Sequence, residues 1–130
     1  MIEIKGIEKN TINTLVKELK KITEVKAIYL FGSYARGNPK PYSDIDISVV
    51  TDKNISLKKR NYLLSFSSKI IDLSLFYNLP LYVQHRVVNE GKLLFSRDLL
   101  LTHRLKITTT LHYLDFKHVL NHHFHKILVS

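Results

Sequence analysis

The segment VKAIYLFGSYARGNPKPYSDIDISVV, residues 25–50, decides the fold because it sets two apolar strands around one loop. Branched and aromatic side chains over 25–31 predict a strand, which Gly32 ends. Glycine, asparagine and two prolines make 37–43 a loop. The pattern over 44–50 predicts a second strand, half exposed where it begins and buried where it ends. No crossover helix fits between the two strands, which favours a mixed sheet over a doubly wound parallel one.

The rest of the chain alternates helical and strand patterns. Apolar residues recur at helical spacing over 11–23, with Asn10 as the predicted N-cap. Ser56 is the predicted cap of the next helix. The later elements are helix, strand, helix, strand and long helix, over 56–67, 69–76, 80–89, 92–96 and 96–126. The predicted fold class is α+β (α/β): one domain over 1–130, with a mixed sheet flanked by helices and a long C-terminal helix.

Composition narrows the functional classes. The chain has 130 residues, of which 45% are hydrophobic, and it has no cysteine, so we expect a packed domain without disulfides or thiolate chemistry. This composition, without a signal-peptide pattern or an apolar run that spans a bilayer, fits a cytoplasmic protein. The net charge of +9 favours acidic or phosphate-rich partners. Nucleic acid is one such partner, but only LKKR at 57–60 forms a compact basic patch, and no motif supports a nucleic-acid groove.

Two aspartates mark the beginning of the second strand. Side chains alternate along a strand, so Asp44 and Asp46 point to the same face. Adjacent carboxylates repel each other unless water surrounds them or a cation lies between them. Magnesium prefers such hard oxygen ligands and usually adds substrate phosphates to them. The pair therefore predicts a metal site, and the alternative is a turn-capping Asp44 with Asp46 on the surface.

Gly32 and Ser33 follow the first strand. Glycine allows a ligand to approach the backbone closely, and the free N–H groups at the beginning of a helical turn attract phosphate. The pair predicts a phosphate site, and the alternative is an ordinary strand-to-helix turn capped by Ser33. The further glycines and the lysine of a P-loop are absent.

Asp72 is an acidic residue inside the apolar strand KIIDLSLF. A lone buried carboxylate costs several kcal/mol, so this side chain must be paired, exposed or bound to a metal. If the strand over 69–76 neighbours the strand over 44–50, Asp72 converges with the two other aspartates. Three carboxylates beside a phosphate site suit two-metal phosphoryl transfer. The alternative is an edge-strand Asp72 that faces water.

The spacing of these residues resembles that of a known family. Gly32–Ser33, ten residues, and then Asp44 and Asp46 resemble the signature of the polymerase-β-like nucleotidyltransferases. GSYARG with SDIDI is most similar to the minimal nucleotidyltransferases, and the similarity extends through IDLSLF and 79–98. The resemblance implies that Gly32 and Ser33 hold the triphosphate of ATP. It implies that Asp44 and Asp46 bind two magnesium ions, and that Asp72 completes one metal site and helps to deprotonate the attacking hydroxyl.

The resemblance also implies a partner. Many members of the minimal family are antitoxins encoded beside a HEPN-domain ribonuclease toxin, and they transfer AMP from ATP to a tyrosine of that toxin. The implied function is magnesium-dependent protein adenylylation within a hetero-oligomer, with no membrane involved. One alternative is an antitoxin that acts by contact alone. Another is nucleotidyl transfer to RNA or to a small molecule.

The C-terminal helix raises two further hypotheses. His118, His122 and His125 recur on one face and could bind zinc, but the pattern favours a solvated or partner-facing helix end. The apolar residues of this helix either pack on the sheet or form a partner surface. They are Leu111, Tyr113, Leu114, Phe116, Val119 and Leu120.

Overall fold

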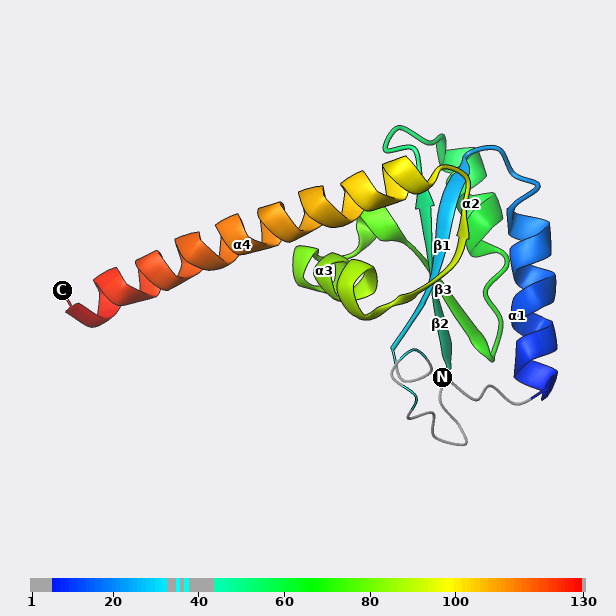
Figure 1. The fold of residues 1–130 in the computed structure, drawn as a ribbon, viewed down its shortest axis with the longest axis horizontal. Coiled ribbons are helices and arrows are strands. Elements are labelled where there is room, and N and C mark those ends of the chain that lie inside the picture. The colour runs from blue at the N-terminus through cyan, green and yellow to red at the C-terminus, as the bar shows by residue number, and fades with distance from the viewer. Residues whose placement is uncertain (1–5, 33–34, 36, 38–43, 130) are drawn as a thin grey trace.

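A mixed sheet forms the centre of the molecule (Figure 1). The computed structural model describes residues 6–32, 35, 37 and 44–129. The strand order is β3-β2-β1-β4, and the strands are β1 (Val25–Phe31), β2 (Ile45–Thr51), β3 (Ile71–Leu75) and β4 (Lys92–Ser96). β1 is antiparallel to β2 and to β4, whereas β3 runs parallel to β2. The predicted mixed sheet is confirmed, and β2 and β3 are neighbours, which is the condition that the sequence set for Asp72 to converge with the other aspartates.

Helices cover both faces of the sheet (Figure 1). The helices are α1 (Gly6–Leu19), α2 (Leu57–Leu64), the short 3-10 helix η1 (Phe76–Asn78), α3 (Leu81–Glu90) and α4 (Leu99–Val129). α1 and α2 pack on one face, while α3 and the first part of α4 pack on the other. The predicted long C-terminal helix is confirmed. No helix in the described ranges has the length and apolar character needed to cross a membrane.

Several predicted boundaries were wrong, and α2, predicted over 56–67, ends at Leu64. α1 contains Asn10, so Asn10 is not its N-cap. Lys9 and Asn10 are exposed and continue the helix on its solvent side, where polar side chains cost little. β3 ends at Leu75 because Phe76 turns into η1 and is buried there. Ser56 is the N-cap of α2 as predicted, and its Oγ accepts a hydrogen bond from the Lys59 backbone N–H.

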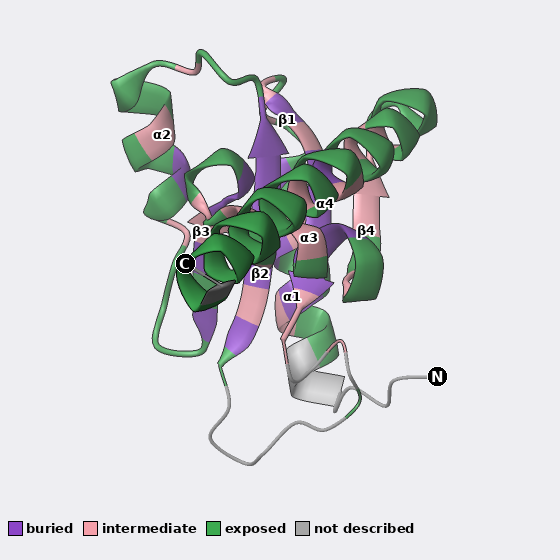
Figure 2. Ribbon diagram, turned by 90° about the vertical axis from the view of Figure 1, so that its left-hand side faces the viewer, coloured by how far each residue is buried: buried purple, intermediate pink, exposed green. Residues whose placement is uncertain are grey.

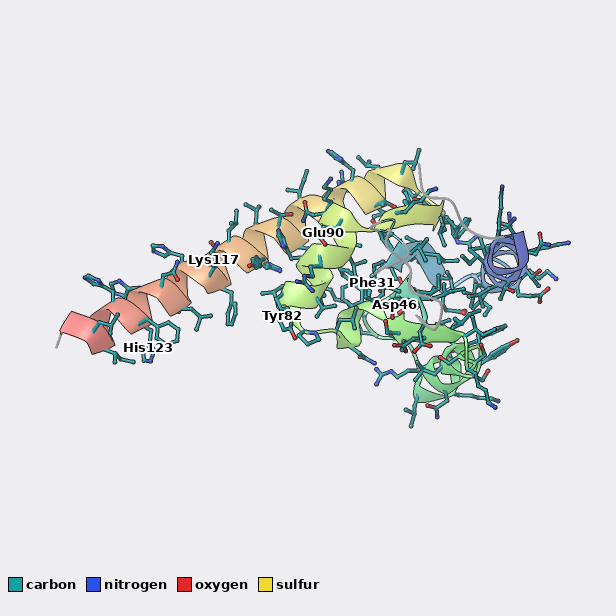
Figure 3. All side chains as sticks on the ribbon, turned by 90° about the horizontal axis from the view of Figure 1, so that it is seen from below. Phe31, Asp46, Tyr82, Glu90, Lys117 and His123 are labelled. Atoms are coloured by element: carbon teal, nitrogen blue, oxygen red, sulfur yellow. The ribbon has the colours of Figure 1, made fainter. Side chains whose placement is uncertain are left out.

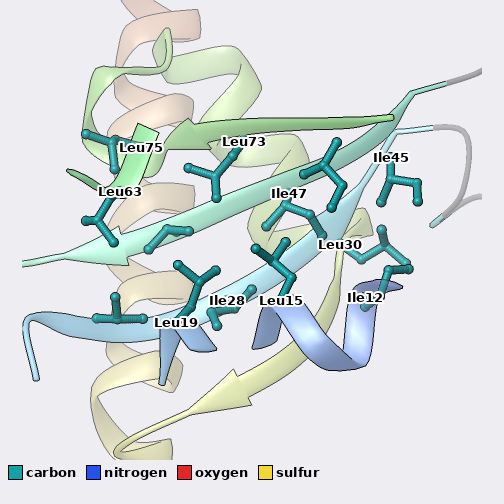
Figure 4. Close-up of a cluster of buried hydrophobic side chains, with 13 residues drawn as sticks. Ile12, Leu15, Leu19, Ile28, Leu30, Ile45, Ile47, Leu63, Leu73 and Leu75 are labelled. Atoms are coloured by element: carbon teal, nitrogen blue, oxygen red, sulfur yellow. The ribbon is translucent and has the colours of Figure 1, made fainter. Parts of the chain in front are cut away.

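The larger core lies between the sheet and the helices α1 and α2 (Figure 4). In β2, Ile45, Ile47 and Val49 alternate with Asp46, Ser48 and Val50. The first set is fully buried in this core, so the second set faces the opposite side. Side chains from other elements complete the core: Ile12, Leu15, Leu19, Val25, Ile28, Leu30, Leu63, Ile71, Leu73 and Leu75.

A smaller core lies on the α3 side of the sheet. It consists of Ala27, Tyr29, Val50, Phe76, Val87 and Val88, with Leu105 of α4 packed against it. Because both faces are packed, a slip of β2 by one residue would bury Asp46 and expose isoleucine. The two cores together fix the register of β2, and that register sets where its acidic side chains lie.

Replacing Leu30 by alanine tests the larger core. Leu30 is fully buried in central strand β1, so we expect the free energy of unfolding to fall by about 2–5 kcal/mol in urea titrations. The control is Leu111→Ala on α4, where the leucine is 56% exposed and the expected change is within about 0.5 kcal/mol. Equal effects of the two substitutions would contradict the packing described.

Candidate active site

Register brings two of the predicted carboxylates together. Asp46 of β2 is the direct partner of Asp72 in the parallel β2–β3 pair, and on its other side Asp46 is paired with Phe31. Register partners in adjacent strands project to the same face. Asp44 precedes β2, two residues before Asp46, and is exposed, as is Asp72, whereas Asp46 is half-buried. The three aspartates therefore lie at one end of the sheet, and the pair Asp46–Asp72 faces α3.

The three aspartates suit a hard cation such as magnesium only if another molecule supplies further oxygen ligands. Carboxylate oxygens are the ligands that magnesium prefers. Within the described ranges, however, no three His, Cys, Asp or Glu side chains form a group that could hold a metal by themselves. Magnesium usually binds one or two carboxylates and completes its shell with substrate phosphates. The residues present fit that mode of binding.

Gly32 lies directly against Asp46. Its φ is +76°, a left-handed conformation that favours glycine. A Cβ at this position would overlap Asp46 Oδ2 and lie 3.1 Å from its Cγ. The absence of a side chain therefore leaves the room that the carboxylate occupies. Ser33, the other predicted phosphate-binding residue, lies outside the described residues.

A cavity of about 200 Å³ opens beside this carboxylate. Its wall combines the ends of β1 and β2 with one side of α3, and Figure 3 labels Phe31, Asp46 and Glu90 there. The lining residues are Phe31, Gly32, Ala35, Asp46, Val83, Arg86 and Glu90. Gly32 and Asp46, predicted from the sequence to share a site, therefore line one cavity.

The sequence did not reveal the contribution of α3. Val83, Arg86 and Glu90 follow one another at intervals of three and four residues, which places them on one side of the helix. This spacing was the available signal, but it is common on solvent-facing helices. Arg86 is exposed and makes no ion pair within the described part of the chain. Its guanidinium is available to an anionic ligand in the cavity.

Inward from Asp46, the α3 face of the sheet has two uncharged polar residues, Tyr29 and Ser48. Tyr29 of β1 is the register partner of Ser48, two residues inward from Asp46. Burial raises the pKa of the Tyr29 phenol, so this group stays protonated at neutral pH. Ser48 is fully buried, and its Oγ has no hydrogen-bond partner among the described residues. Among the described lining residues, the charged ones are Asp46 at the sheet and Arg86 and Glu90 on the helix.

A second cavity, of about 450 Å³, lies at the opposite end of the sheet between the strands and α4. Its ionisable lining includes Lys26, Lys53, Arg104 and a single carboxylate, Asp52. Burial and the Asp52 charge raise the pKa of Tyr77 in the same wall. One carboxylate does not provide the set of ligands described above. The predicted site residues Gly32 and Asp46 line the smaller cavity instead.

His112 of α4 lines the larger cavity, whereas the three histidines predicted to share a helix face line neither cavity and are exposed. His118, His122 and His125 form no metal-binding group in the described part of the chain. They lie on the exposed far part of α4, and their role stays a prediction.

Comparisons with known proteins give this geometry a family context. Residues 13–99 match the family described as "Polymerase beta, Nucleotidyltransferase". "Putative protein adenylyltransferase MJ1547" of Methanocaldococcus jannaschii is 33% identical over 79 residues, which are 60% of this chain and 62% of the relative. Three other putative protein adenylyltransferases of the same organism also match. The chain spans less than two thirds of the length of each of these four relatives.

Solved structures share the fold over most of the chain. One chain of a crystal structure of a toxin-antitoxin with AMP-PNP has a TM-score of 0.68 and 24% identity, covering 92% of this chain and 98% of its own. One chain of the tri-AMPylated Shewanella oneidensis HEPN toxin in complex with MNT antitoxin has a TM-score of 0.67 and 21% identity, covering 97% of this chain and all of its own (100%). At these identities, the matches establish the fold.

The contact between Gly32 and Asp46 can be tested with two matched glycines. Gly37 has a φ of +77°, close to that of Gly32, but no atom of the described residues lies within 4 Å of a Cβ placed there. Gly37→Ala should therefore cost only the backbone strain, about 1–2 kcal/mol in the free energy of unfolding. We expect Gly32→Ala to cost about 1–3 kcal/mol more because the carboxylate must also move. Urea unfolding measures both, and equal losses would contradict the close contact.

Proposed function

Because the chain belongs to the polymerase beta nucleotidyltransferase family, we propose that it is a magnesium-dependent protein adenylyltransferase. In this proposal it transfers AMP from ATP to a tyrosine of a HEPN-domain toxin, and so acts as the antitoxin. The observation that carries the proposal is the register pair Asp46–Asp72, of which Asp46 lines one cavity together with Gly32. It combines paired carboxylates with a backbone that a phosphate can approach.

The relatives support the choice of reaction and partner. The M. jannaschii relative is named for protein adenylyl transfer. One similar structure contains AMP-PNP, and another contains an AMPylated HEPN toxin with its MNT antitoxin. We extend the reaction and the type of partner from these proteins to this chain on the basis of the shared family and the shared fold.

Magnesium would be held by Asp44, Asp46 and Asp72 together with phosphate oxygens. Bound magnesium, two ions in this proposal, would offset the triphosphate charge and lower the pKa of the attacking hydroxyl. Since the described carboxylates do not form a three-ligand group by themselves, the phosphates must supply the remaining ligands. Metal and ATP should therefore bind together.

The protein's own residues would orient the reactants. Gly32, and Ser33 next to it, would hold the phosphates with backbone N–H groups, and Arg86 would pair with a phosphate from the α3 side. The tyrosine oxygen attacks the α-phosphorus, and the bond to the bridging oxygen breaks, so pyrophosphate leaves. Asp72, exposed beside Asp46, would accept the hydroxyl proton. Positioning and charge stabilisation then account for most of the rate.

The cellular setting follows from the proposed substrates. Both ATP and a ribonuclease toxin are present in the cytoplasm, where we place the reaction. A chain without cysteine has no disulfide to lose in that reducing compartment.

Neutralisation by contact alone is the second candidate function. It is favoured by α4, whose far half is exposed and rich in apolar residues. Under this alternative, a chain without the aspartates would still protect cells from the toxin. Under the proposed function, protection would require them.

The first functional experiment is mass spectrometry of the HEPN-domain protein encoded beside this chain, after incubation with the chain, magnesium and each of the four ribonucleoside triphosphates. We expect a mass gain of one or more AMP units with ATP. Asp44→Asn combined with Asp46→Asn should slow the transfer at least about a hundredfold, because the charge that holds the metal is lost. Asp52→Asn, at the other end of β2, is the control and should transfer normally. Stable complex formation with no mass gain from any nucleotide would favour the contact alternative.

Arg86 provides a separate test of the cavity. Arg86→Ala removes one cation from the ATP side, so KM for ATP should rise by about ten- to a hundredfold with little change in kcat. Arg104→Ala makes the same change of charge at the second cavity and should leave KM unchanged. Steady-state transfer rates at varied ATP concentrations measure both variants. An unchanged KM in Arg86→Ala would place the triphosphate elsewhere.

A further inference from the structure

The far half of α4 projects from the body of the protein (Figure 1). Every residue from Leu114 to Leu128 is exposed, although many of them are apolar. Figure 2 shows this part of the helix entirely in the colour of exposed residues. An isolated helix of this length is marginally stable in water. The sequence therefore maintains an apolar helix where the described part of the chain provides no packing for it.

The apolar residues of this segment continue the face by which α4 packs on the body. Leu105 packs against the smaller core, and Thr109 is buried. The ring of Tyr113 stacks on His85 of α3, with centroids 4.0 Å apart and planes at 8°. Steps of three and four residues keep a helix on the same side. The next residues on this side are Phe116, Leu120 and Phe124.

We call Phe116, Leu120 and Phe124 the α4 stripe. They are 50%, 37% and 56% exposed. Apolar residues at such intervals are the contacts by which one amphipathic helix binds another, and aromatic residues contribute disproportionately to such interfaces. The α4 stripe therefore has the pattern of a helix-binding surface that extends the packed side of α4 outwards.

The charges around the stripe distinguish a foreign partner from a second copy of this chain. The segment 116–128 contains two lysines, four histidines and no carboxylate. Helix geometry places Lys117 and His123 on the two borders of the stripe, and Figure 3 labels both on the projecting helix. Pairing two copies along this stripe would bring lysine towards lysine or histidine with no acid to offset them. A partner with acidic borders would complement it.

We propose that the α4 stripe docks an amphipathic helix of the acceptor protein whose apolar side is bordered by aspartate and glutamate. This inference rests on the proposed function, because that function supplies the acceptor. It adds the surface, the type of element and the charge of the partner. It also gives a reason for part of the basic charge of the chain, which the family motifs do not explain.

The experiment measures binding between the full chain and the HEPN-domain protein encoded beside it, by isothermal titration calorimetry without nucleotide at about pH 8, where histidine is neutral. Leu120→Glu and Phe124→Glu should each weaken binding by roughly tenfold or more. The control is His122→Glu, which makes the same change of charge on the opposite side of the helix and should bind normally. Because these positions are exposed, circular dichroism should show the same fold in all variants.

A second pair of variants tests the charge of the partner. Lys117→Glu should weaken binding several-fold, and raising salt from about 0.05 M to about 0.5 M should weaken the unmodified chain more than this variant. Lys58→Glu on α2 is the control for charge reversal away from the stripe. Unchanged affinity in Lys117→Glu would overturn the acidic partner.

The remaining outcomes separate this inference from the proposed function. Normal binding by Leu120→Glu and Phe124→Glu, or no binding by the unmodified chain, would overturn the inference. A third outcome would also overturn the inference: the chain alone forms a dimer in sedimentation experiments, and Phe124→Glu dissociates that dimer. A second copy of the chain would then cover the stripe. Failure of the proposed function looks different: binding is lost in the stripe variants as expected, yet the unmodified chain adds no nucleotide to the bound protein.

Discussion

The alternation of side chains along β2 is the constraint on which the site depends. Ile45, Ile47 and Val49 are fully buried against α1 and α2. Burying each of these side chains stabilises the fold by roughly 1.5–3 kcal/mol. A one-residue slip would forfeit all three contributions and bury a carboxylate instead. The hydrophobic core thus holds Asp46 on the α3 face of the sheet.

The alternation of side chains along the parallel strand β3 fixes the position of Asp72 in the same way. Ile71, Leu73 and Leu75 are buried in the same core, which puts Asp72 on the same face as Asp46. In-register pairing then places the two like charges side by side. Such a pair destabilises a sheet unless a cation or water offsets the repulsion. Because Asp72 is exposed and Asp46 half-buried, water lowers this cost in the absence of a ligand, and a bound cation would turn it into an attraction.

Local pattern was sufficient for most of the fold. Strands Val25–Phe31 and Lys92–Ser96 match their predictions residue for residue, since apolar branched runs between breakers are strong local signals. Predicting that Asp46 pairs with Asp72 requires knowing that β2 and β3 are neighbours. The sequence did not show this strand order, so the convergence of the aspartates could be stated only as conditional on it. Arg86 was missed because its position in the wall of the smaller cavity comes from the packing of α3 beside the end of β1, a tertiary relation without a local signal. The beginning of α1 was missed because polar residues on the solvent side of a helix resemble a cap or a loop.

The helix α3 contacts both the smaller cavity and the beginning of the projecting part of α4. One side of α3 contributes Val83, Arg86 and Glu90 to the smaller cavity, while His85 stacks on Tyr113 of α4. A helix of ten residues therefore lies between the cavity and the root of the projecting helix. Because α3 is also fixed to the sheet by the buried Val87 and Val88, it cannot shift towards α4 without disturbing the smaller core. A protein held along the α4 stripe would consequently keep a fixed position relative to the carboxylates. Transfer to one tyrosine of a large partner requires such a fixed geometry, because proximity and orientation supply much of the rate.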